Sequence, residues 1–139
     1  MPRSKKTLGF TLIELLIVMV ILGLLAALIA PRMIGKIGKS KVKAAKSQIE
    51  MLSTALDSFK LDTGRYPTTE EGLKALIENP GIKGWDGPYL KKKKIPKDPW
   101  GNDYIYRCPG EHDTYDILSY GADGKPGGEG ENADLGSWE

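Results

Sequence analysis

The sequence predicts an α+β protein, in which a long N-terminal helix packs on a small antiparallel β-sheet and a glycine-rich loop follows at the C-terminus. Three observations support this prediction. Residues 10–31 form an apolar run that suits a membrane-spanning first half of the helix. From Ser40, apolar residues recur every three or four positions, as on an amphipathic second half. Two short runs, 104–107 and 115–120, are rich in residues that favour strands.

The composition excludes several classes of protein. The 20 Lys and Arg against 18 Asp and Glu give a formal net charge of +2, which offers no case for binding nucleic acid. The single cysteine, Cys108, excludes an internal disulfide framework, and the single histidine, His112, excludes a histidine-rich metal or catalytic cluster. We expect Cys108 to be buried within a strand and His112 to lie on the surface. The sequence contains no P-loop, HExxH or GxSxG motif, so we expect no enzymatic activity.

The apolar run, FTLIELLIVMVILGLLAALIAP, contains one charged residue, Glu14. As a helix it spans about 30 Å, the thickness of a bilayer's hydrocarbon core. An ordinary secretory signal peptide has a shorter apolar core. A plain membrane anchor leaves Glu14 unexplained, because a carboxylate inside an apolar helix is costly unless it has a partner. In the alternative interpretation, Glu14 lies near the membrane interface and stays hydrated.

A cut between Gly9 and Phe10 would supply a partner for Glu14. The cut creates a positive α-amine on Phe10, and Glu14 lies one helical turn further along, on the same face. In a bundle of such helices, the amine of one subunit and the Glu14 carboxylate of its neighbour would neutralise each other. This staggered pairing would set the axial register between subunits.

The segment KKTLGFTLIELLIVMVILGLLAALIAP resembles the class III signal of type IV pilins and pseudopilins. That pattern is a short basic leader ending in glycine, then phenylalanine, threonine and a glutamate five residues into the mature chain. The resemblance implies that a prepilin peptidase removes residues 1–9 on the cytoplasmic face, that Phe10 is N-methylated, and that the folded part lies outside the inner membrane. The basic residues favour the opposite orientation: the leader holds three, whereas six follow the apolar run, namely Arg32, Lys36, Lys39, Lys41, Lys43 and Lys46.

Pro31 closes the apolar run, and residues 32–62 are expected to form the amphipathic half of the long helix. Because proline removes a helical hydrogen bond and glycine weakens a helix, we expect a soft joint between Gly23 and Gly38 that lets the helix extend within a fibre. The alternative is a helix that ends at Pro31 and is followed by a linker. The stripe expected to cover the sheet consists of Val42, Ala45, Ile49, Leu52, Leu56 and Phe59.

Residues 63–139 are expected to form a globular α+β part. Thr68 and Glu71 match a capping box that would open a short helix with Leu73, Leu76 and Ile77 on its apolar face. The two strand-like runs would pair as an antiparallel hairpin. YPTTEEGLKAL and DPWGNDYIY resemble the major pseudopilins of type II secretion, so the resemblance covers nearly the whole chain and implies a pilin-like fold.

The C-terminal segment, GADGKPGGEGENADLGSWE, combines many glycines with five acidic residues. One interpretation is a mobile acidic tail. The other is a loop that Leu135 and Trp138 anchor on the core, and a loop fixed at both ends and rich in oxygen ligands suits calcium better than magnesium. The resemblance also implies a structural calcium site. The residues that match its ligands are the carboxylates of Asp123 and Asp134, the carbonyls of Tyr120 and Lys125, and Asn132, with Glu129 and Glu131 as weaker candidates.

The function that the resemblance implies is that of a structural subunit of a periplasmic pseudopilus, which drives export of folded proteins across the outer membrane. Its partners would be further copies of the chain in a homopolymer, minor pseudopilins, prepilin peptidase and an inner-membrane assembly platform, with no nucleic acid. A type IV pilin of a surface pilus is the alternative, but such pilins often carry a C-terminal disulfide-bounded loop. A membrane-anchored enzyme or binding domain would leave Glu14 unexplained.

Overall fold

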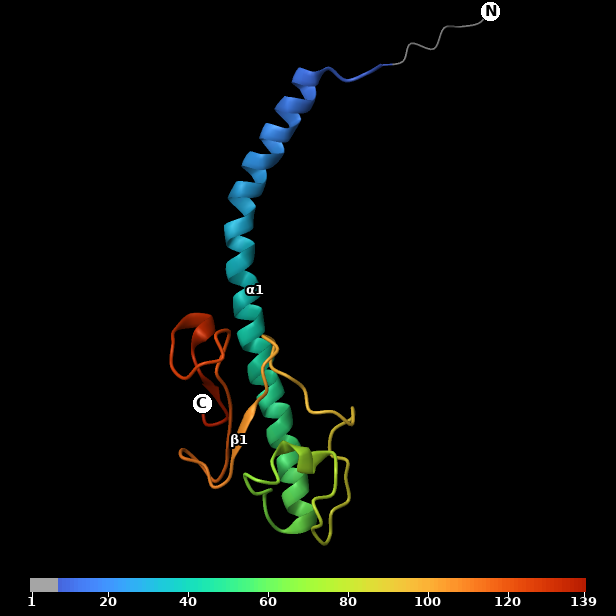
Figure 1. Cartoon of the computed structure of the whole chain (residues 1–139), viewed down its shortest axis with the longest axis vertical. Helices are drawn as coiled ribbons and strands as arrows, with labels where there is room; N and C mark the ends of the chain where they lie inside the picture. Colours follow the sequence, from blue (N-terminus) through green and yellow to red (C-terminus); the bar gives the residue numbers. More distant parts are fainter. Residues whose placement is uncertain (1–7) are drawn as a thin grey trace, which may run out of the picture. The chain divides into compact units, whose positions relative to one another are not determined.

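The computed structural model describes residues 8–139, apart from the side chains of residues 30, 31, 33 and 34. Most of the expected leader, residues 1–7, lies outside this range. The elements follow in the order α1 (Leu12–Thr63), η1 (Leu73–Leu76), β1 (Ile105–Arg107), β2 (Asp116–Ser119), η2 (Gly130–Asn132) and β3 (Leu135–Gly136), where η marks a 3₁₀ helix (Figure 1). The chain divides into two compact units, whose boundary in the sequence lies between Ile37 and Gly38.

The helix α1 is continuous from the apolar run into the amphipathic segment (Figure 1). Thr11 caps it: the Thr11 hydroxyl accepts a hydrogen bond from the Glu14 N–H (3.2 Å). Because the backbone stays helical through Pro31, the interpretation in which the helix ends there and a linker follows is wrong. Proline removes one hydrogen bond, and the helix-favouring residues on both sides maintain the rest. The soft joint between Gly23 and Gly38 stays a prediction.

In the second unit, the amphipathic stripe of α1 forms one side of the hydrophobic core, as predicted. Five of the six expected residues are buried, and Val42 packs against the core while remaining partly exposed. Phe59 is fully buried and meets the edge of the Tyr89 ring, with the ring centroids 5.9 Å apart. The buried core residues outside α1 are Leu73, Ala75, Leu76, Leu90, Tyr104, Tyr106, Ile117 and Leu135.

The sheet confirms the predicted hairpin and adds one strand to it. β1 pairs antiparallel with β2, in a register that places Ile105 opposite Leu118. β2 pairs antiparallel with β3, which places Ser119 opposite Leu135, so β2 is the central strand. Sequence analysis missed β3 because its two residues, Leu135 and Gly136, are too few to show an alternating pattern and one of them is glycine.

The capping box between Thr68 and Glu71 is present, but it closes a turn rather than the expected short helix. The Glu71 N–H donates to the Thr68 hydroxyl (3.1 Å), and the Thr68 N–H donates to the Glu71 carboxylate (2.9 Å). Gly72 follows with a φ of +62°, which ends the turn, and a single 3₁₀ turn, η1, comes next. Glycine at this position explains why the apolar spacing of Leu73 and Leu76 does not extend into an α-helix.

The ion pair between Glu71 and Arg65 should make the stability of the fold depend on pH. The Arg65 guanidinium donates to both of its oxygens (2.6 and 3.2 Å) and lowers the pKa of Glu71 to about 2. A carboxylate with a lowered pKa stabilises the fold at pH values above the pKa of the unfolded chain, about 4.3, and this stabilisation is lost as the pH falls towards 2. We expect Glu71→Gln to lower the free energy of unfolding at pH 7 by about 1 kcal/mol. The effect is this small because the Arg65 side chain is half exposed, and solvent screens its attraction to Glu71.

Urea denaturation at several pH values checks this prediction. The difference between the original chain and Glu71→Gln should shrink between pH 5 and pH 2, because the protonated glutamate then resembles glutamine. Glu70→Gln is the matched control, since Glu70 is a neighbouring exposed carboxylate. A difference that stays constant from pH 7 to pH 2 would contradict the assignment to the Arg65–Glu71 pair.

Candidate functional sites

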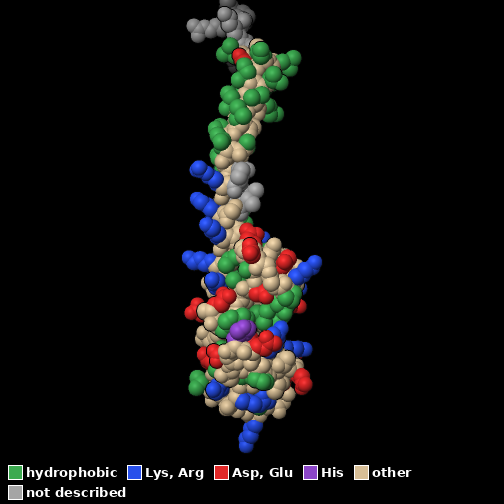
Figure 2. Space-filling model, turned by 90° about the vertical axis from the view of Figure 1, so that its left-hand side faces the viewer, with side chains coloured by type: hydrophobic (Ala, Val, Ile, Leu, Met, Phe, Trp, Pro, Cys, Tyr) green, Lys and Arg blue, Asp and Glu red, His purple; other side chains and the backbone are tan. Residues whose placement is uncertain are grey.

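The N-terminal part of α1 presents an apolar surface on all sides. Leu12–Ile29 is long and apolar enough to cross a membrane, and none of it is buried. Each large apolar side chain from Phe10 to Ile29 is at least half exposed, and Figure 2 shows these side chains gathered along the helix. Soluble monomers rarely expose an apolar patch of more than a few hundred Å². This surface therefore requires a bilayer or neighbouring helices to cover it.

Glu14 lies in the first turn of α1, where the helix dipole favours a negative charge. Phe10 precedes the helix and is 82% exposed. Phe10 and Glu14 share one helical face only if the helix extends by two residues, which the new chain end after a cut at Gly9 would permit. Leu8 is almost fully exposed, and an added Cβ on Gly9 would meet no atom within 4 Å, so the Gly9–Phe10 junction is accessible.

The C-terminal loop is fixed at both ends, as the anchored interpretation predicted. Leu135 is buried in the core, and the Ser137 N–H donates to the Ile117 carbonyl (2.9 Å). The Trp138 ring stacks on the His112 ring, with centroids 3.8 Å apart and planes 5° from parallel. The mobile-tail interpretation is therefore wrong, because both predicted anchors make contacts with the rest of the fold.

Two carboxylates hold turns of this loop, one of them exposed (Asp123) and the other partly buried (Asp134). Asp123 accepts a hydrogen bond from the Lys125 N–H (3.1 Å), which forms a tight turn. Asp134 reaches across the loop and accepts one from the Gly127 N–H with its Oδ2 (3.1 Å). The other oxygen of Asp134, Oδ1, is buried and has no hydrogen-bond partner among the described residues. A buried carboxylate oxygen without a donor is costly, so this atom is a candidate ligand for a cation.

Glycines let the two arms of the loop approach each other closely. An added Cβ on Gly121 (φ +76°) would lie 2.5 Å from the Glu131 carbonyl oxygen and 2.8 Å from that of Ala133. One on Gly128 (φ +100°) would lie 2.5 Å from the Asn132 carbonyl oxygen. A side chain at either glycine would clash with these carbonyl oxygens, so both positions require glycine.

The structure separates the predicted ligand candidates into two groups. Asp123, Lys125, Asn132 and Asp134 belong to the loop, and Tyr120 directly precedes it. Glu131, a weaker candidate, has its side chain against α1 instead, because an added Cβ on the buried Gly38 would overlap its carboxylate. The described residues hold no group of three His, Cys, Asp or Glu side chains placed for a metal ion, so a cation here depends on main-chain oxygens.

Sequence analysis missed two buried carboxylates, Asp98 and Asp116, which lie outside the loop. Asp116 accepts hydrogen bonds from the Glu111 and His112 N–H groups (2.8 and 3.1 Å), and its Oδ2 lies 3.1 Å from His112 Nδ1. Burial alone would raise the pKa of Asp116, but these hydrogen bonds outweigh it, so the pKa lies below its ordinary value. His112 is half exposed, as expected for a surface histidine, and it braces the C-terminus through Trp138. The expectation that Cys108 is buried within a strand is wrong: Cys108 is only partly buried and follows β1, and the next residue, Pro109, has no N–H with which to continue the strand.

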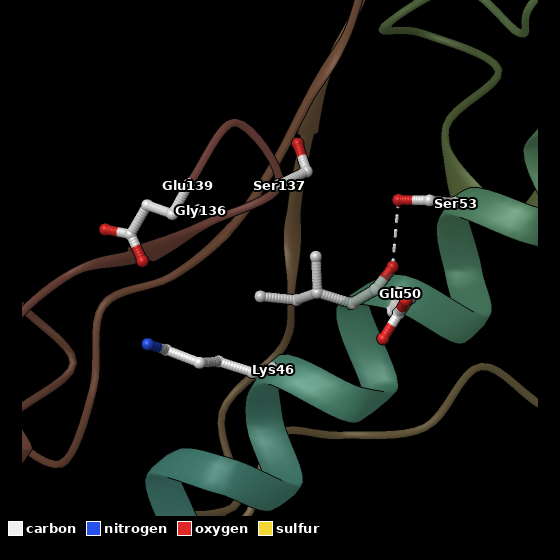
Figure 3. Close-up of a pocket in the computed structure, with 7 residues that line it drawn as sticks. Lys46, Glu50, Ser53, Gly136, Ser137 and Glu139 are labelled. Atoms are coloured by element: carbon white, nitrogen blue, oxygen red, sulfur yellow. Dashed lines mark hydrogen bonds between the residues drawn. The ribbon is translucent and has the colours of Figure 1, made fainter.

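A groove of about 380 Å³ lies between α1 and the end of the chain (Figure 3). Its polar side chains are Lys46, Glu50 and Ser53 from the helix and Ser137 and Glu139 from the C-terminus. The Ser53 hydroxyl donates to the Ile49 carbonyl (2.9 Å), as Figure 3 shows. Because that bond occupies its proton and the groove lining contains no histidine, Ser53 is not arranged as an activated nucleophile.

The family described as type II secretion system protein G matches residues 32–138, and the prokaryotic N-terminal methylation motif matches residues 4–30. The chain belongs to the protein G family of type II secretion systems. Protein G sequences of Pseudomonas aeruginosa and Vibrio cholerae are 49% and 46% identical to it. The former alignment covers 100% of this chain and 99% of the relative, and the latter covers 99% and 96%.

The crystal structure of the major pseudopilin of enterohaemorrhagic Escherichia coli is similar to this protein G chain. The TM-score is 0.64 at 36% sequence identity, and the match covers 76% of this chain and 92% of the other. The pilin-like fold and the resemblance to major pseudopilins are therefore confirmed, and the type IV pilin alternative gains no support. The protein G family is a structural family of the secretion machinery rather than a known family of enzymes.

Proposed function

We propose that this chain is processed after Gly9 and polymerises into the periplasmic pseudopilus of a type II secretion system. The observation that carries the proposal is the exposed apolar helix with a carboxylate, Glu14, in its first turn, directly after a junction that matches the N-terminal methylation motif. A bilayer covers such a helix before assembly. In the fibre, the helices of neighbouring subunits cover one another, and the Phe10 amine of one subunit neutralises Glu14 of the next.

The chain supplies geometry rather than chemistry in this function. It begins as a single-pass protein of the inner membrane, and its second unit becomes the outer shell of the fibre in the periplasm. Growth of the fibre on an inner-membrane assembly platform moves folded proteins through the outer membrane. Minor pseudopilins and prepilin peptidase are the further partners that follow from this scheme, and the soft joint around Pro31 lets the helix extend between subunits.

A structural calcium ion in the C-terminal loop is the second part of the proposal. The residues that would hold it are Asp123, Asp134, the carbonyls of Tyr120 and Lys125, and Asn132. The buried Oδ1 of Asp134, which has no hydrogen-bond partner among the described residues, supports this assignment. When bound, the ion supplies positive charge that holds the two arms of the loop together, and these residues orient their oxygens towards it.

The mature N-terminus tests the main proposal. We expect mass spectrometry of the protein from its native host to show a chain that begins at Phe10 with a methylated amine. The exposed junction at Leu8 and Gly9 makes the cut accessible. The same protein from a strain without prepilin peptidase is the control and should retain Met1. A chain that keeps Met1 in the native host, or one cut near Ala27 as a secretory signal would be, contradicts assembly into a fibre.

A further inference from the structure

Asp98 is a buried carboxylate outside the C-terminal loop, with an exposed fraction of 4%. Its Oδ1 accepts hydrogen bonds from the Trp100 and Asn102 N–H groups (3.1 and 2.8 Å), and its Oδ2 accepts one from the Ser119 hydroxyl (2.7 Å). No lysine or arginine pairs with it within the described part of the chain. Its role is therefore to hold hydrogen-bond donors in place, and one of these donors, Ser119, is the last residue of β2.

Ser119 links the Asp98 carboxylate to the Tyr120–Gly121 peptide group, where the loop begins. Its hydroxyl is fully buried, donates to Asp98 and accepts a hydrogen bond from the Gly121 N–H (3.2 Å). The Gly121 N–H and the Tyr120 carbonyl belong to the same planar peptide group and point in opposite directions. By fixing the N–H, the Ser119 hydroxyl also fixes the direction of the Tyr120 carbonyl, which is one of the proposed calcium ligands.

The turn that contains Asp98 also touches the loop at a second point. An added Cβ on Gly124 (φ +65°) would lie 3.3 Å from the Asn102 side-chain amide. The Asn102 backbone is held by Asp98, since Asn102 donates its N–H to the Asp98 carboxylate and the Asp98 N–H donates to the Asn102 carbonyl (2.8 Å). One buried carboxylate therefore braces the loop at Gly121 and at Gly124, on both sides of Asp123.

We propose that Asp98 and Ser119 are positioning residues for the cation site of the C-terminal loop: they hold the Tyr120–Gly121 peptide so that the Tyr120 carbonyl faces the calcium ion. This inference rests on the proposed calcium site. Neither residue contacts the ion. They order part of the glycine-rich loop before calcium binds, so the loop loses less conformational entropy on binding. This raises the affinity for calcium without adding a ligand.

The test is isothermal titration with calcium of the full chain in detergent micelles, well below the melting temperature. We expect Ser119→Ala to raise the calcium dissociation constant at least about 10-fold, which is the usual effect of removing a residue that orients a metal ligand. The matched control is Thr69→Ala. The Thr69 hydroxyl also donates one hydrogen bond and accepts another, but its partners are the backbone carbonyl and N–H of Cys108 (3.1 and 2.9 Å), outside the loop. Thr69→Ala should lower the melting temperature in chelator and leave the dissociation constant unchanged.

A second variant covers the possibility that Ser119→Ala does not fold. Asp98→Asn keeps the shape of the side chain but presents an NH₂ donor to the Ser119 hydroxyl in place of the oxygen acceptor, and it should also weaken binding. If the folded variants bind calcium as tightly as the original chain while melting at a lower temperature, Asp98 and Ser119 only stabilise the fold and the inference is overturned. If the original chain itself gives no binding heat, the calcium site fails and this inference fails with it.

Discussion

Glu14→Leu should abolish fibre assembly and protein secretion while the chain still inserts into the membrane. The substitution leaves the Phe10 amine of the neighbouring subunit without a counter-charge inside the bundle of apolar helices. Breaking a buried ion pair by removing one partner is strongly destabilising, because the remaining charge is not compensated. We expect fibre yield and secretion to fall about 100-fold or more, since the penalty recurs at each added subunit.

Sheared fibres and the secreted fraction of a type II substrate are the two measurements for this variant, with membrane fractionation as the check on insertion. Glu14→Gln separates charge from size, because it keeps the shape of the side chain, and it should fail in the same way. Ile17→Leu, a volume-conserving change at an exposed apolar position of the same helix, is the control and should assemble normally. Normal filaments from Glu14→Leu protomers would refute the pairing.

Removal of calcium should lower the melting temperature of the second unit, measured on a soluble fragment that begins near Lys36. An ion that binds only the folded state adds RT ln(1 + [Ca]/Kd), which is about 2.7 kcal/mol when calcium exceeds Kd 100-fold. For a unit of this size that corresponds to a change in melting temperature of about 10 °C or more. Asp123→Ala and Asp134→Ala should melt at the lower temperature in both calcium and chelator.

Thermal melts followed by circular dichroism, in excess calcium and in excess chelator, decide this prediction. Asp103→Ala is a suitable control, because Asp103 is an exposed aspartate outside the loop and its side chain is 85% exposed. That variant should retain the full difference between the two conditions. Superimposable melting curves of the unchanged fragment with and without calcium would exclude a structural ion in the loop.

The parts of the fold that the sequence predicted are those in which one local pattern determines the structure. The stripe from Ala45 to Phe59 repeats with the period of an α-helix, so its burial followed from spacing alone. β3 and the turn before η1 depend on other information. β3 exists because the distant strand β2 offers a pairing edge, and the turn ends at Gly72 because of a backbone conformation that apolar spacing does not encode. Pro31 stayed helical because local helix propensity outweighed one missing hydrogen bond.

The residues of the candidate cation site also differ in whether a local sequence pattern predicts them. Asp123 and Asp134 stand out in the sequence because they are acidic residues among glycines, and the structure places both within the anchored loop. Asp98 and Ser119 gave no comparable signal. An aspartate before a proline and a serine at the end of a strand are common, and only the fold brings the two side chains together over 21 residues of sequence separation.

The third strand, β3, pairs with β2 and is joined to it by the glycine-rich loop. The connection between β1 and β2 is shorter, and a shorter connection costs less conformational entropy to close. The β1–β2 hairpin should therefore form first, and it offers the free edge on which β3 and the loop become ordered last.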